Sequence, residues 1–269
     1  MANILALANQ KGGVGKTTTA VNLAASLGAI NRRVLVIDLD PQGNATMGCG
    51  VDKHQLSITS GDVLLGKAGI ADGILQVDRA ACALLPANGD QTVAEIELIT
   101  ATEREFRLRR ALDSVDGRFD YVLIDCPPAL NTLTVNALVA AHGVIIPMQC
   151  EYYALEGLSA LIGTIERIRQ AANPALRIAG LLRTMFDPRN NLANDVSNQL
   201  ISHFGDRVFE TVIPRNVRLA EAPSHGLPVL LYDKASRGAL AYLSLAGELL
   251  RKERRSAAQQ SEHLLHTQT

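Results

Sequence analysis

Several features that would indicate other classes of protein are missing from this sequence of 269 residues. It has no tryptophan, only 4% aromatic residues and a net charge of −1, so its overall charge gives no indication of nucleic-acid binding. No apolar run approaches the roughly 18 residues of a membrane-spanning helix, and no secretory signal precedes the first apolar segment. We therefore expect a soluble, cytoplasmic protein in which any contact with DNA or a membrane comes from a local surface patch.

The cysteines are few and widely spaced, and no two of them form a CxxC pair. This spacing favours small buried side chains in a reducing cytosol over a disulfide framework or a zinc site. The alternative is an iron–sulfur cluster shared between two subunits, which needs two suitably placed cysteines in each chain. Only Cys126 follows a predicted strand in a suitable way; the others are Cys49, Cys82 and Cys150.

Short apolar segments alternate with longer segments of helical periodicity along the chain. Several of the short segments are apolar throughout, which is typical of strands buried on both faces of a parallel sheet. The alternation predicts a doubly wound, mostly parallel α/β sheet with helices on both faces. The predicted strands are Ile4–Asn9, Val34–Asp38, Ala83–Pro86, Tyr121–Asp125, Val144–Met148, Ile178–Met185 and Val208–Ile213. The predicted helices are Lys16–Ile30, Glu103–Val115, Thr132–Ala141, Leu155–Gln170, Asn191–Phe204 and Gly238–Arg251.

The length and the 47% hydrophobic composition suit one large domain, because α/β folds commonly exceed 200 residues without dividing. We assign residues 1–255 to this domain. Residues 256–269 are polar and lack sustained periodicity, so we expect them to form a flexible tail. Ligands of doubly wound sheets bind beyond the carboxyl ends of the strands, and the motifs below fall at such ends.

A glycine-rich segment, GGVGKTT at residues 12–18, joins the first predicted strand to the first predicted helix. Its glycines allow backbone N–H groups to approach phosphate oxygens, and the helix N-terminus favours the same negative charge. Lys16 would reach the β- and γ-phosphates, and the Thr17 hydroxyl would bind Mg²⁺. We therefore predict a site for ATP and Mg²⁺. Its nucleotide-binding residues are expected to be Lys11, Gly12, Gly13, Val14, Gly15, Lys16, Thr17 and Thr18.

This segment departs from the ordinary P-loop pattern GxxxxGK[ST]. Gln10 stands where the pattern has its first glycine, and a second lysine, Lys11, follows it. The segment is thus a variant P-loop, and Lys11 is its informative departure.

Two predicted strands end in aspartates that can complete the site. Asp125 ends a hydrophobic strand in the Walker B manner, and we expect it to hold the magnesium shell directly or through water. Asp38 and Asp40 are two positions apart at the end of another strand, on one side of an extended chain. We expect Asp40 to orient the attacking water and to join the metal site, and Asp38 to have the smaller direct role. A lone aspartate at a strand end usually caps a helix or a turn, so the P-loop in the same chain carries this assignment.

Together these motifs resemble the ParA/Soj family of partitioning ATPases, within the deviant Walker A (ParA/MinD) class. The resemblance spans roughly residues 2–250, and its two longest motifs, in the C-terminal third, go beyond generic nucleotide binding. It rests on KGGVGKTT at 11–18, DLDPQGNAT at 38–46, VLIDCPP at 122–128, RTMFDPRNN at 183–191 and IPRNVRLAEAPSHGLP at 213–228.

The resemblance implies an ATP-dependent homodimer with two nucleotides at its interface. Lys11 is then the signature lysine that reaches the partner's ATP, and Lys11, Lys16 and Asp40 are the catalytic residues. Pro214 and Asn216 match positions that frame the adenine. The family's activity is a slow, Mg²⁺-dependent hydrolysis of ATP that a ParB-type centromere-binding protein stimulates, in chromosome or plasmid segregation on the nucleoid.

Arg189 and Arg218 match family positions for nonspecific binding of double-stranded DNA. Composition alone supports this less, because residues 183–237 hold seven Lys or Arg against six Asp or Glu, as on an ordinary solvated surface. Phosphate contacts give affinity that is independent of sequence and sensitive to salt, and a dimer doubles the available arginines.

Two rival functions share the nucleotide motifs. A MinD-type membrane ATPase needs a C-terminal amphipathic helix with bulky apolar residues, but residues 245–255 end in RKERR, and the later Leu264–Leu265 pair is a small anchor, so we expect no membrane binding. A nucleotide-dependent DNA-binding regulator that barely hydrolyses ATP is compatible with the same residues, and measured turnover would separate it from a partitioning ATPase.

Overall fold

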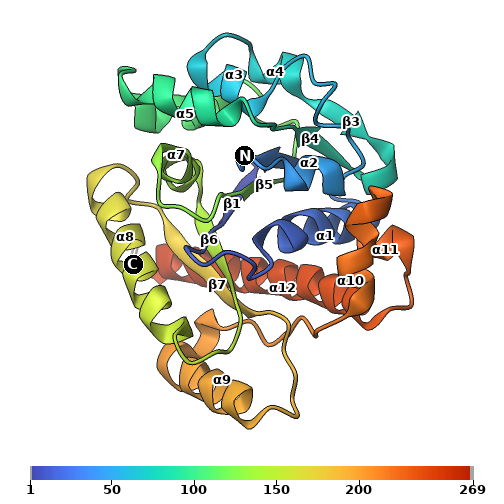
Figure 1. The fold of residues 1–269 in the computed structure, drawn as a ribbon. Helices are drawn as coiled ribbons and strands as arrows, with labels where there is room; N and C mark the ends of the chain where they lie inside the picture. The colour runs from blue at the N-terminus through green and yellow to red at the C-terminus, as the bar shows by residue number, and fades with distance from the viewer. Residues whose placement is uncertain (1, 267–269) are drawn as a thin grey trace.

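The computed structural model describes residues 2–266, and the side chains of residues 2–255. A seven-stranded sheet in the order β3-β4-β2-β5-β1-β6-β7 forms its centre (Figure 1). Neighbouring strands are parallel except β3, which runs antiparallel to β4. The strands are β1 (Asn3–Leu7), β2 (Val34–Asp38), β3 (Leu75–Val77), β4 (Cys82–Leu85), β5 (Tyr121–Asp125), β6 (Gly143–Met148) and β7 (Arg177–Arg183).

Helices cover both faces of the sheet, which confirms the doubly wound fold class. One buried cluster includes residues of α3, α6, α7, α8 and α9, and the other includes residues of α1, α2, α11 and α12. Along β1, Ala6 belongs to the first cluster while Leu5 and Leu7 belong to the second, because successive side chains of a strand point to opposite faces. The helices are α1 (Lys16–Ala29), α2 (Asn44–Gly48), α3 (Ser60–Leu65), α4 (Ile70–Gly73), α5 (Gln91–Ile99), α6 (Arg107–Asp113), α7 (Thr132–Ala140), α8 (Ala154–Ala171), α9 (Asn191–Phe204), α10 (Val217–Glu221), α11 (Val229–Tyr232) and α12 (Arg237–His266).

One predicted strand, Val208–Ile213, is wrong. This segment runs beside β7, with an isolated bridge between Leu181 and Val208 and backbone hydrogen bonds from Phe209 N–H to the Leu181 carbonyl at 3.0 Å and from Ile213 N–H to the Arg183 carbonyl at 2.9 Å, but it forms no continuous strand. The reason is a buried carboxylate: Glu248 of α12 accepts the backbone N–H groups of Glu210 at 2.8 Å and Thr211 at 2.9 Å. These donors are satisfied by a side chain, so the segment needs no sheet ladder.

The C-terminal helix is longer than the sequence pattern predicts. The pattern places its end at Arg251, whereas α12, which packs against α1, continues to His266 (Figure 1). Most of the expected tail, from Ser256 onward, therefore continues this helix in its backbone, and residues 267–269 lie outside the described residues.

Candidate nucleotide-binding site

The order of the strands brings the sequence motifs together at the carboxyl edge of the sheet. β5 lies between β1 and β2, and Asp125 is in register with Leu7 of β1 on one side and with Asp38 of β2 on the other. The P-loop leaves β1 directly beyond this point. Asp125 therefore lies between the phosphate-binding loop and the loop that carries Asp40, as the crevice of a doubly wound sheet requires.

The glycines of the P-loop leave the space that a phosphate chain would fill. Gly13 has φ 73° and Gly15 has φ 88°, the left-handed conformation that side chains other than glycine rarely adopt. A Cβ atom on Gly12 or Gly13 would meet no other atom within 4 Å. Gly15 also caps α1 without a side-chain hydrogen bond, so the first N–H groups of the helix have no capping side chain. This open cradle of donors fits an anionic oxygen ligand.

Side chains from the neighbouring strands hold the loop in place, and sequence reasoning missed them. The Thr184 hydroxyl, just beyond β7, donates to the Val14 carbonyl at 2.8 Å. Gln149, just beyond β6, donates its amide to the Gly13 carbonyl at 3.0 Å. Their only signal in the sequence is that each follows a strand end at the edge where ligands bind.

Lys16 lies inside the loop that it closes. It is 7% exposed, and its ammonium donates to the Lys11 carbonyl at 3.1 Å. Burial lowers the pKa of Lys16, while the Asp125 and Asp40 carboxylates oppose this shift. A phosphate anion at the same place would give this buried charge a close partner.

Asp125 is completely buried. Neither carboxylate oxygen of Asp125 has a hydrogen bond of good geometry in the described part of the chain, although the Thr17 side chain lies close enough to lower the pKa of Asp125. Burial first, and then the Asp38 carboxylate, raise the pKa of Asp125 well above its usual range, against the opposing effects of Thr17 and Lys16. Orphaned oxygens of this kind fit a cation, and Mg²⁺ with its shell of oxygen ligands suits them.

No group of three or more His, Cys, Asp or Glu side chains within the described residues can hold a metal ion by itself. This agrees with Mg²⁺ chemistry, because the ion is usually held by one or two protein groups together with substrate phosphates and water. Thr17 and Asp125 are the groups that would supply the protein's share. Asp40 lies close enough to both lysine and carboxylate to affect their pKa values.

Asp38 and Asp40 have different surroundings, which their spacing alone did not reveal. Asp38 is fully buried and accepts three hydrogen bonds, from Asp40 N at 3.1 Å, Thr46 N at 2.9 Å and the Thr46 hydroxyl at 2.8 Å. Burial raises the pKa of Asp38 to about 6, although these hydrogen bonds lower it. Asp40 has a single partner, the N–H of Gln42 at 2.9 Å, and is 8% exposed. Asp38 is thus committed to its own loop, and Asp40 retains capacity for a water or a metal-bound water.

Lys11 lies outside the phosphate cradle. Its side chain is about half exposed and its ammonium pairs with Glu151, which follows β6. Its backbone N–H donates to the Asn9 side chain at 3.0 Å. Lys16 alone therefore serves the cradle of its own chain, and the Lys11 charge is available at the surface.

The two residues expected to frame the adenine lie at the same edge of the sheet. Pro214 forms a bridge with Phe186, in the continuation of β7 that also carries Thr184. Asn216 caps α10, and its side-chain oxygen accepts the N–H of Arg218 at 3.0 Å.

Both expected DNA-binding arginines are paired with carboxylates. Arg189 is highly exposed and makes two hydrogen bonds to Asp187, at 2.9 and 2.8 Å. Arg218 is half exposed and contacts Glu221 at 2.8 Å and Asp233 at 3.3 Å. DNA phosphates would have to compete with these carboxylates.

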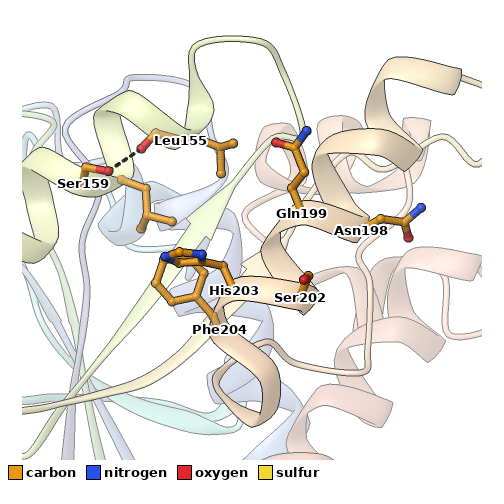
Figure 2. Close-up of a pocket in the computed structure, with 8 residues that line it drawn as sticks. Leu155, Ser159, Asn198, Gln199, Ser202, His203 and Phe204 are labelled. Carbon is orange, nitrogen blue, oxygen red and sulfur yellow. Dashed lines mark hydrogen bonds between the residues drawn. The ribbon is translucent and has the colours of Figure 1, made fainter.

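A separate hollow of about 580 Å³ lies between α8 and α9, remote in sequence from the P-loop (Figure 2). Apart from one histidine its lining carries no ionisable group, so it does not suit a triphosphate. The lining residues are Leu155, Leu158, Ser159, Asn198, Gln199, Ser202, His203 and Phe204.

Each cysteine in the described part of the chain is free and buried. Cys126, the candidate for a shared cluster, is 1% exposed behind β5, and burial and the Asp125 carboxylate raise the pKa of its thiol. This placement does not suit a cluster ligand at a subunit interface. Within the described residues, no helix is both long enough and apolar enough to cross a membrane.

A variant P-loop, a Walker B aspartate and a doubly wound parallel sheet define a P-loop nucleoside triphosphatase of the deviant Walker A class. A family model described as an AAA domain matches residues 2–178. The chromosome partitioning protein ParA of Caulobacter vibrioides is 51% identical over 253 residues, which cover 93% of this chain and 95% of that protein. The chromosome-partitioning ATPase Soj of Thermus thermophilus is 51% identical over 248 residues, covering 91% and 94%. The chain belongs to the ParA/Soj family of chromosome-partitioning ATPases.

A solved structure extends the similarity to another named protein. The crystal structure of cobyrinic acid a,c-diamide synthase from Mycobacterium smegmatis, with a bound ATP analog and magnesium, has a TM-score of 0.83 and 40% sequence identity. The match covers 94% of this chain and 96% of that one.

Proposed function

We propose that this protein is an ATP-controlled DNA-partitioning ATPase. ATP and Mg²⁺ bind at residues 12–18 and favour a homodimer in which each Lys11 contacts the partner's nucleotide. The dimer binds double-stranded DNA without sequence preference through Arg189 and Arg218, in the cytoplasm on the nucleoid. A ParB-type partner stimulates hydrolysis, after which the dimer loosens and leaves the DNA, during segregation of a chromosome or plasmid.

The position of Lys11 is the observation that supports the proposed dimer. Its ammonium pairs with an exposed glutamate, whereas the buried Lys16 fills the cradle of the same chain. An exposed ion pair contributes only about 0–1 kcal/mol, so this contact is easily exchanged for one with a phosphate. A lysine that is free to reach a neighbouring active site resembles an arginine finger supplied in trans.

Bound Mg²⁺·ATP supplies the transferable phosphoryl group, and Thr17 and Asp125 are the residues that would hold its metal. Lys16 would then balance the charge of the terminal phosphates inside a buried site, where electrostatic stabilisation is strong. Asp40, with free acceptor capacity, would orient the attacking water. Slow intrinsic turnover follows if a partner is needed to complete this geometry.

Control of DNA binding by ATP follows from charge and from dimerisation. The carboxylates that pair with Arg189 and Arg218 weaken phosphate binding by a single chain. Two chains held together double the number of arginines that reach one duplex, and the second contact becomes intramolecular.

The test is DNA binding by the purified protein in ADP, in ATP and in a nonhydrolysable ATP analogue, each at several salt concentrations. We expect retention on DNA in ATP and in the analogue, loss in ADP, and affinity that falls steeply with salt. Equal retention in all three nucleotides would contradict the proposal. Hydrolysis measured in the same samples separates this function from a DNA-binding regulator that barely turns over ATP.

The amide synthesis named for the 40% identical relative is the second candidate. The higher identity, 51%, is to chromosome-partitioning proteins, and the described cysteines are buried and cannot act as exposed nucleophiles. Formation of an amide from glutamine or ammonia in the presence of a corrinoid acid would favour that reaction over partitioning.

A further inference from the structure

A backbone contact joins the segment that carries Asp40 to the segment that carries Arg218. Gly50 follows α2, and Gly226 follows the short 3₁₀ turn at Ala222–His225. A Cβ atom on Gly50 would lie 2.6 Å from the Gly226 carbonyl oxygen, and one on Gly226 would lie 2.8 Å from the Gly50 Cα. The two main chains touch with no side chain between them, so a displacement of one is felt directly by the other.

At the nucleotide end, α2 is tied to the position of Asp40. The Asp40 carboxylate accepts the Gln42 N–H at 2.9 Å, and the Asp40 carbonyl accepts the Gly43 N–H at 2.9 Å. α2 begins at the next residue, and its Thr46 binds the buried Asp38. If the Asp40 carboxylate turns toward a bound nucleotide, it releases Gln42, this turn shifts, and the single-turn helix α2 shifts with it.

At the other end, the segment with Arg218 is fixed to the P-loop helix. The amide of the buried Asn22 donates to the Thr18 carbonyl at 2.7 Å and accepts the Val229 N–H at 2.7 Å. This bridge anchors the start of α11 to the first turns of α1; α11 lies beside that helix, and α10 contacts α11 and α12 (Figure 1). Residues 217–228 are therefore held to α1 at Asn22 and touch α2 at Gly226. A movement of α2 relative to α1 would displace Gly226 relative to the anchor at Val229, and α10, which carries Arg218, leads directly into the turn that ends before Gly226.

We propose that Gly50 and Gly226 are positioning residues that couple the nucleotide site to the arginine surface. The nucleotide sets the position of Asp40 and α2, and the glycine contact transmits this position to α10 and to Arg218. This inference rests on the proposed function, because it concerns how ATP controls DNA binding. The coupling is reciprocal, so DNA must also raise the affinity for ATP through the same contact.

The test uses Gly226→Ala and Gly50→Ala, with Gly117→Ala as the matched control. Gly117 also has a positive φ, 77°, but a Cβ there meets no atom within 4 Å. Gly117→Ala therefore carries the same backbone strain as the two contact variants without disturbing a contact. We expect all three variants to bind ATP with similar affinity when DNA is absent. The ratio of DNA affinity in ATP to that in ADP should fall by about 5-fold or more in the two contact variants and stay unchanged in the control.

An unchanged ratio in Gly226→Ala and Gly50→Ala, with DNA binding still dependent on ATP in the wild type, overturns the coupling and leaves the proposed function intact. A wild type that binds DNA equally in ATP and ADP overturns the proposed function instead. If the contact variants fail to fold, amide hydrogen exchange of the wild type decides. Binding of ATP should change the exchange rates of residues 222–226, which lie beyond the α10 cap at Asn216, and identical rates with and without ATP contradict the coupling.

Discussion

The phosphate edge and the arginine surface of this protein differ in how their charges are balanced. At the phosphate edge, the buried Asp125 carboxylate has no hydrogen-bond partner among the described residues, and Gly12 and Gly13 face open space. On the arginine surface, Arg189 and Arg218 each have a carboxylate partner already. The polar groups of the first region need a ligand to satisfy them. The arginines of the second region are already paired, and a ligand has to displace their carboxylates. Nucleotide binding is therefore built into one chain, whereas the proposed DNA binding would need an added factor such as a second chain.

The largest effect is expected from Lys16→Ala. This change removes the buried charge that faces the phosphates, and truncating one member of a buried charge pair costs about 2–5 kcal/mol, so the Kd for ATP should rise by roughly 100-fold. Isothermal titration calorimetry measures it, with Lys234→Ala, an exposed lysine, as the control. Native ATP affinity in Lys16→Ala would show that the phosphates are bound elsewhere.

Lys11→Ala should weaken the ATP-dependent dimer while ATP binding by the monomer stays nearly unchanged. The interfacial charge pair that this change removes is worth about 2 kcal/mol or more, and the dimer Kd should rise by roughly 30-fold. Light scattering with ATP measures the change. Glu151→Ala is the matched control, because it breaks the same exposed ion pair and leaves Lys11 in place, so it should still dimerise. Full dimerisation of Lys11→Ala would remove the cross-subunit role.

Asp125→Asn should stabilise the protein when Mg²⁺ and nucleotide are absent. Burial raises the pKa of Asp125 in the folded chain, so that chain keeps a proton which the unfolded chain has released, and stability falls as pH rises above about 4. The variant has no such proton to hold, so its unfolding free energy near neutral pH should exceed that of the wild type by about 2 kcal/mol. This gain in unfolding free energy should vanish as the pH falls to about 4 and below, where Asp125 is protonated in both the folded and the unfolded chain.

Thermal unfolding in EDTA across pH measures this effect, and Asp120→Asn is the contrasting control. Arg33 lowers the pKa of Asp120, so that carboxylate stabilises the folded chain above its ordinary pKa and the contribution is lost on acidification. Its removal should therefore destabilise the protein at neutral pH. Addition of Mg²⁺ and ATP should stabilise the wild type more than Asp125→Asn; equal stabilisation would contradict the metal assignment.

The smallest effect is expected from Arg218→Glu on DNA. Removal of one arginine–phosphate interaction should weaken binding by about 10-fold at low salt and reduce the slope of log affinity against log salt by about 0.9 for each phosphate that is no longer neutralised. Fluorescence anisotropy with a random duplex measures both. Arg169→Glu is the matched control, because Arg169 pairs with Glu166 at 2.7 Å in the same i, i+3 arrangement as Arg218 with Glu221 at 2.8 Å. Equally weakened binding in both variants would indicate a general charge effect, and loss of ATP binding would indicate misfolding.

Strong periodic segments were predicted accurately from the sequence. β2, β5 and α9 begin and end at the predicted residues, because each is a buried apolar run or a well-capped amphipathic helix. The short helices α2, α3, α4, α10 and α11 and the three-residue strand β3 were not predicted, since segments of six residues or fewer carry too little periodicity, and the nine-residue α5 was also missed. The strand predicted at Val208–Ile213 was wrong because the Glu210 N–H donates to Glu248, a residue almost forty positions away. No local sequence pattern reveals that contact.

The residue types of the nucleotide site were readable in the sequence, because phosphate and magnesium chemistry demand glycine, lysine, threonine and aspartate at set spacings from a strand end. Tertiary structure decided which of these groups stay unpaired. The parallel register of β1, β2 and β5 leaves Asp125 without a partner, and the turn after β2 gives Asp38 three donors and Asp40 one. Contacts between distant segments, such as Gly50 with Gly226 or Lys11 with Glu151, depend on how helices pack around the sheet, and local sequence patterns do not encode that packing.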